Sequence, residues 1–203
     1  MSQQHMDRRI ILAFYRDEMA AQRVLDDLNE QDFPLDRVSV LGKASSSGDD
    51  PLGIYYPSAG ERAKGWGRLG ALWGGLLGLL GGAAGMFVLP GIGPLMAAGP
   101  IAESLVGAAG GSAIGGAVMA GGGAMSELGV AIHRAGVPEE QLEEAEELIG
   151  DGRHLVMLIL NEQEFNEWRE LLQRHDPNPL WHFVYPGFAD AVESYAREIA
   201  QEK

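Results

Sequence analysis

Residues Leu69–Ser126 form a stretch of 58 positions in which Glu103 is the only charged residue. Within it, glycine recurs at four-residue steps, at Gly70, Gly74, Gly78, Gly82 and again at Gly107, Gly111, Gly115. Small residues at this spacing let two helix backbones approach closely, so that dispersion and Cα–H···O contacts replace side-chain packing. The pattern therefore predicts two apolar helical arms folded back on each other, with these seven glycines as helix-packing positions.

The uncharged segment Pro90–Pro100 separates the two predicted arms. Proline and glycine interrupt helices, and this segment is predicted to turn at Pro90, Gly91, Gly93, Pro94, Gly99 and Pro100. Pro100 suits the first position of the second arm, which places Glu103 in its first turn, where the helix dipole stabilises a carboxylate. The alternative interpretation is an intramembrane acid on a path for protons or cations.

The first arm, Leu69–Leu89, has 21 residues. As a helix it would be about 31 Å long, which matches a hydrocarbon core of about 30 Å. The second arm, Ser104–Ser126, is poorer in large apolar side chains and is predicted to insert only as the partner of the first. Basic residues flank the pair, at Arg62, Lys64, Arg68, His133 and Arg134. The positive-inside rule then predicts both termini in the cytoplasm; the alternative is a soluble hairpin buried between subunits.

The flanking sequences predict an α+β unit. Four strands are expected, at Arg9–Tyr15, Arg37–Leu41, His154–Leu160 and Trp181–Tyr185, and four helices, at Asp17–Gln31, Pro138–Ile149, Glu162–Arg174 and Phe188–Gln201. Two βαβ units suggest a ferredoxin-like sandwich of strand order 4-1-3-2, with the helical hairpin inserted between its second and third strands.

The predicted domain bounds follow from this reading. Residues 1–43 and 131–186 form the ferredoxin-like domain, residues 44–65 a linker, residues 66–130 the glycine-rich hairpin and residues 187–203 a C-terminal amphipathic helix.

Two of the expected strands constrain assembly. Ile10–Tyr15 and Leu155–Leu160 are apolar at nearly every position, whereas a half-exposed antiparallel strand alternates apolar with polar residues. The two helices of a ferredoxin-like sandwich cover one face of its sheet. We therefore expect the C-terminal helix, or else a second copy of the chain, to cover the other face.

The charge and the residue inventory exclude several functions. The formal net charge of −14 argues against nucleic acid, whose phosphates require clustered lysine and arginine. The chain has no cysteine, so thiolate chemistry and cysteine-based metal sites are excluded. The five histidines form no close ligand pair, and there is neither a Gly-x-Ser-x-Gly motif nor a phosphate-binding Lys-Ser/Thr in the glycine-rich tract. No enzyme, cofactor or metal site is predicted.

Three motifs carry a family resemblance: Phe33–Leu41 (FPLDRVSVL), Pro90–Pro100 (PGIGPLMAAGP) and Gly136–Glu140 (GVPEE). With the order βαβ, polar linker, glycine-rich hairpin and second half, residues 9–160 resemble the bacterial general-stress or low-temperature-induced membrane protein family. The resemblance implies a stress-associated membrane protein with no established chemistry.

The leading functional hypothesis is thus a membrane-tethered structural or interaction protein of the bacterial inner membrane. It would contact membrane lipid and assemble into homo-oligomers through its glycine zipper during stress. One alternative is an oligomeric pore or small-solute pathway. Another is a soluble oligomeric ligand-sensing module.

Overall fold

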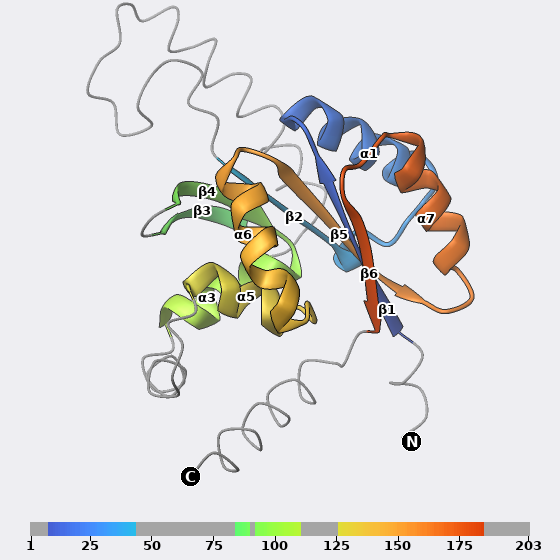
Figure 1. Ribbon diagram of the computed structural model, residues 1–203. Coiled ribbons are helices and arrows are strands. Elements are labelled where there is room, and N and C mark those ends of the chain that lie inside the picture. The colour runs from blue at the N-terminus through green and yellow to red at the C-terminus, as the bar shows by residue number, and fades with distance from the viewer. Residues whose placement is uncertain (1–7, 44–83, 90–91, 111–125, 185–203) are drawn as a thin grey trace, which may run out of the picture.

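The computed structural model describes residues 8–43, 84–89, 92–110 and 126–184. In these ranges the chain is an α+β protein with a six-stranded antiparallel sheet and five α-helices (Figure 1). The strands lie in the order β3-β4-β2-β5-β1-β6. Their bounds are β1 Arg8–Tyr15, β2 Val38–Lys43, β3 Ala84–Leu89, β4 Gly93–Ala98, β5 His154–Asn161 and β6 Leu180–Val184.

The centre of the sheet is the antiparallel pair β1–β5. Its register runs from Arg8 opposite Asn161 to Tyr15 opposite His154. Residues 10–15 are fully buried, because helices cover both faces of the sheet here. The strands expected near residues 9–15, 37–41, 154–160 and 181–185 are all confirmed.

One face of the sheet, here called the first face, is covered by α1 (Glu18–Glu30) and α7 (Phe165–Arg174). The α1 helix begins after Asp17, whose side chain accepts a hydrogen bond from the Ala20 backbone at 2.9 Å. Each helix buries one apolar stripe, which includes Val24 and Leu28 in α1. Both helices were expected from this periodicity, although α7 begins three residues later than predicted.

The opposite, second face is covered by α3 (Pro100–Gly110), α5 (Glu127–Arg134) and α6 (Leu142–Gly150). Two 3-10 turns complete the described elements, η1 (Leu35–Arg37) before β2 and η2 (Glu139–Gln141) before α6. Ser126 caps α5 by accepting from the Gly129 backbone and also contacts Glu146 of α6. The expectation about this face is therefore corrected: helices of the same body cover it, whereas the predicted C-terminal helix lies outside the described residues.

The first predicted helical arm is wrong over its last six residues. Ala84–Leu89 form β3. Most of the predicted turn Pro90–Pro100 forms β4, the second strand of a β-hairpin that leads into α3. The hairpin extends the sheet beyond β2, and this extension buries Leu89 and Leu95 beneath α3. Pairing with β4 provides hydrogen-bond partners for the backbone of β3, and the burial of Leu89 and Leu95 further favours the hairpin over a helix.

The domain bounds change accordingly. Residues 84–89, 92–110 and 126–130 share a sheet and a core with the rest of the described chain, and do not form a separate helical hairpin. Within the described ranges, no helix is both long and apolar enough to cross a bilayer.

Gly99 tests this arrangement because it lies where α3 meets β2. Its φ is +78°, and an added Cβ would lie 2.1 Å from the Val38 carbonyl oxygen. Gly93 has a similar φ of +93° but has no atom within 4 Å of such a Cβ. We expect Gly99→Ala to destabilise the fold by clearly more than Gly93→Ala, for which backbone strain alone costs about 1–2 kcal/mol. Urea unfolding measures the difference, and equal losses would contradict the close approach.

Candidate functional site

The predicted helix-packing glycines fall mostly outside the described residues. Gly70, Gly74, Gly78, Gly82, Gly111 and Gly115 all lie there, whereas Gly107 lies in α3. The pairing of the two glycine ladders thus stays a prediction.

The predicted turn residues have separate roles. Gly93 and Pro94 begin β4, Gly99 precedes α3, and Pro100 is the first residue of α3, as expected. Pro90 and Gly91 lie outside the described residues. The Ile101 backbone N–H donates to Ser39 Oγ at 3.2 Å, which holds the start of α3 against β2.

The α3 helix has two unlike sides. Its inner side is buried against the sheet through Ile101, Ala102 and Leu105. On its outer side, Glu103 is exposed in the first turn and Val106 is 56 % exposed. Helical spacing places Gly107 and Gly110 on that same outer side. These four residues, of which Glu103 and Val106 are exposed, are here called the outer face of α3.

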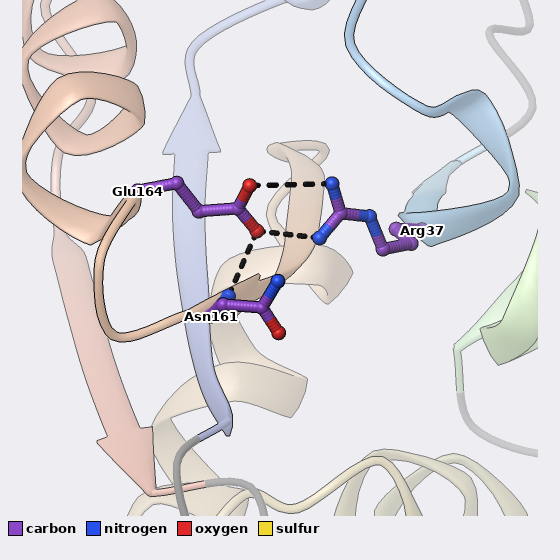
Figure 2. Close-up of polar contacts among 3 residues, drawn as sticks. All are labelled: Arg37, Asn161 and Glu164. Atoms are coloured by element: carbon purple, nitrogen blue, oxygen red, sulfur yellow. Dashed lines mark hydrogen bonds and ion pairs between the residues drawn. The ribbon is translucent and has the colours of Figure 1, made fainter. Parts of the chain in front are cut away.

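A polar cluster that the sequence analysis missed joins the two halves of the chain (Figure 2). The Arg37 guanidinium, next to β2, donates two hydrogen bonds to the Glu164 carboxylate, at 2.5 and 3.4 Å. Glu164 Oε1 also accepts from the Asn161 backbone N–H at 2.8 Å. Each ion-pair side chain is only 24 % exposed.

The environment of Glu164 favours its ionised form. Burial opposes ionisation, but the hydrogen bonds from Arg37 and Asn161 and the Arg37 charge outweigh it and lower the pKa of Glu164. Arg37 also stacks over Phe33, at 5.0 Å from the ring centroid. The Arg37 guanidinium thus contacts both the Glu164 carboxylate and the Phe33 ring. These contacts join the turn before α7 to the turn before β2.

A second ion pair lies at the same end of the sheet. Arg9 of β1 binds Glu162 and lies 5.1 Å from the Phe165 ring centroid. Through these contacts Arg9 joins β1 to the residues at the start of α7. This geometry indicates a structural role at this end of the sheet.

An open groove of about 600 Å³ lies on the outer surface of α1 and α7. It is lined by Gln31, Glu167, Glu170, Gln173 and Arg174. His175, the residue after α7, also contacts α1: its Nε2 atom lies 2.8 Å from Asp27 Oδ2, which links the two helices. The lining is polar and of mixed charge, and it includes no buried side chain. This composition is typical of solvated surface more than of a pocket for a small molecule.

His154 is the one described histidine that is fully buried, at 4 % exposed. Neither ring nitrogen makes a well-formed hydrogen bond with a described residue. The ring lies against Gly42, where an added Cβ would be 2.3 Å from it. Burial lowers the pKa of His154 and outweighs the opposing effects of the Asp17 charge and the Gly152 backbone. His154 is therefore a core residue whose uncharged form is favoured by burial. The described residues include no group of three side chains that could hold a metal ion.

No family model, curated protein or solved structure matches this chain. The resemblance to the general-stress membrane family therefore stays a prediction from the three sequence motifs.

We expect Arg37 and Glu164 to be energetically coupled. A double-mutant cycle of Arg37→Met and Glu164→Gln should give a coupling of about 1 kcal/mol at pH 7, because the pair is half-buried and bidentate. The folded-state pKa of Glu164 is depressed, so its contribution is present above the ordinary value of 4.5 and is lost as the pH falls through the lowered pKa. The coupling should therefore vanish in acid.

Chemical denaturation of the four proteins at several pH values measures this coupling. Arg16 and Asp17 provide the matched control, because their side chains are 85 % and 47 % exposed and their coupling should be near zero. Additive losses at pH 7 for Arg37 and Glu164 would refute a coupled pair.

Proposed function

We propose that this chain is a non-enzymatic interaction protein that associates with copies of itself through the outer face of α3. The observation that carries the proposal is the division of α3 into a buried apolar side and an outer side, where Val106 is exposed and helical spacing places Gly107 and Gly110. An isolated solvated helix favours alanine or charged residues on such a side, since glycine costs about 1 kcal/mol relative to alanine. Close approach of a second helix is a reason to keep glycine there.

The described polar groups make contacts that hold the fold together. In the part of the chain that the structure describes, the prominent ion pairs tie one element of the fold to another. Among the described residues, His154 is the buried histidine; it lies against Gly42, and burial lowers its pKa. We therefore infer a protein whose function lies in its surfaces.

We further propose that β2, β5, β1 and β6 with α1 and α7 form a ferredoxin-like unit, to which β3, β4 and the second layer of helices are added. The neighbouring order of these four strands supports it, as does the placement of α1 and α7 on one face. The helix ends also echo each other: Asp32 follows α1 and Asp176 follows α7, with φ of 56° and 54°.

Self-association can be measured on the full chain by sedimentation equilibrium. We expect concentration-dependent oligomers, with Val106→Asp weakening association at least roughly tenfold, or about 1.4 kcal/mol. Gly107→Ala should separate two effects: it favours the helix by up to about 1 kcal/mol, yet it should weaken association if backbones approach closely.

Gly150→Ala is the matched control for that experiment. Gly150 is the last residue of α6 and has no atom within 4 Å of an added Cβ, so its substitution should leave association unchanged. A wild-type chain that stays monomeric at every concentration would reject the proposed function.

Membrane attachment is the second candidate, favoured by the fifteen uncharged residues 69–83 and by the basic residues before them, Arg62, Lys64 and Arg68. A stress-linked location at the bacterial inner membrane, with cytoplasmic termini, is proposed on the same residues and on the family resemblance. We expect such a chain to stay in the membrane pellet after carbonate treatment, while a truncated variant lacking residues 66–83 is released. Complete release of the full chain would reject attachment.

A further inference from the structure

The β3 strand forms one edge of the sheet. Within the described ranges its strand neighbour is β4, so the backbone groups on its other side have no strand partner there. Natural sheets protect such an edge with lysine, proline or a bulge. Residues 84–89 contain neither a charged residue nor a proline, and their register with β4 is continuous. The edge of β3 is therefore suited to pairing with a further strand.

The side chains of β3 suit pairing with a second copy of the same strand. Met86 is 50 % exposed and Val88 is 66 % exposed, on the face opposite to Phe87 and Leu89, which pack with the core of the second face. In a two-fold interface, residue i contacts residue j and j contacts i. When two copies of β3 pair antiparallel about Phe87, Met86 of each copy lies opposite Val88 of the other. This register brings the exposed apolar side chains together in both copies.

The charge of the chain favours self-association at this edge. Two copies that each carry a net charge of −14 repel each other, so an uncharged surface is the favourable place for contact. The hairpin segment 84–98 contains no charged residue. At the opposite edge of the sheet, Val184 of β6 lies opposite Arg9, whose ion pair with Glu162 adjoins that strand. The edge of β3 therefore suits a second copy better than the edge of β6.

The α3 helix lies beside the edge of β3. It contacts β3 and β4 and has α5 on one flank, with α6 further toward β2 (Figure 1). A two-fold axis perpendicular to the sheet keeps each face on the same side in both copies, so the two α3 helices lie on one side of the joined sheet. A six-residue strand is only about 20 Å long. The outer face of α3 enlarges the contact toward the roughly 800 Å² per partner of a standard interface.

We infer that two copies of this chain pair antiparallel along β3, so that their sheets join into one. Backbone hydrogen bonds form between the two edges, and Met86 of each copy packs against Val88 of the other. This inference rests on the proposed self-association and specifies its geometry, because it adds a strand pairing to the contact through the outer face of α3.

The absence of cysteine from the chain permits a direct test of this register. Met86→Cys and Val88→Cys are made separately in the full chain, and each is oxidised alone and in an equal mixture. In the inferred register, positions 86 and 88 of two copies have Cα atoms about 5 Å apart, whereas like positions lie about 7–8 Å apart, beyond the usual reach of a disulfide. We expect disulfide-linked dimers mainly in the mixture. Dimers that form as readily from one variant alone would overturn the inference.

A second test introduces the residue that natural sheets place on exposed edges. Val88→Lys reduces the net negative charge, so a loss of association reflects the edge itself and not general repulsion. By sedimentation equilibrium on the full chain, we expect association at least roughly tenfold weaker than wild type. Val184→Lys is the matched control, because Val184 is 63 % exposed on the other edge strand and should leave association unchanged. Urea unfolding of both variants confirms an intact fold.

The outcomes distinguish failure of this pairing from failure of the proposed function. Oligomers of undiminished strength in Val88→Lys would overturn the pairing and leave the edge to a strand of another protein, while association through α3 would stand. Weakening by Val88→Lys without any effect of Val106→Asp would support the pairing and reject the outer face of α3. Weakening by Val184→Lys alone would overturn the pairing in favour of the β6 edge.

Discussion

The β1–β5 pair is the constraint on which the rest of the structure depends. Ile10, Ile11, Leu12 and Phe14 are fully buried, and they point alternately to the two faces of the sheet. Burial of each such side chain contributes about 1.5–3 kcal/mol relative to exposure. A sheet with one layer of helices would lose that contribution on its other face. The chain therefore has to supply two layers, and α3, α5 and α6 are the second.

This requirement explains why part of the glycine-rich stretch belongs to the folded body. The second layer needs helices that return over β2 and β5, and α3 is the first of them. To begin there, the chain must reverse at Gly99, where the backbone of α3 comes close enough to Val38 that no side chain fits. Apolar residues that suit a bilayer by composition can equally fill this interior. Composition alone therefore did not separate the two environments.

The sequence predicted the elements whose periodicity is strong. The α1 helix and the apolar strands β1 and β5 were all located within a few residues. It failed at Ala84–Leu89, because an apolar run without alternation does not distinguish strand from helix, and the deciding partner, β4, lay in a segment taken as a turn. The Arg37–Glu164 pair was missed because its members are 127 residues apart and only the fold brings them together.

The glycines of the apolar stretch Leu69–Ser126 serve several physical ends. Gly85 lies in a strand, Gly99 permits a positive φ beside another backbone, and Gly107 lies on the outer side of a helix. Each position removes a side chain for a different reason, so spacing alone could not assign them a common role.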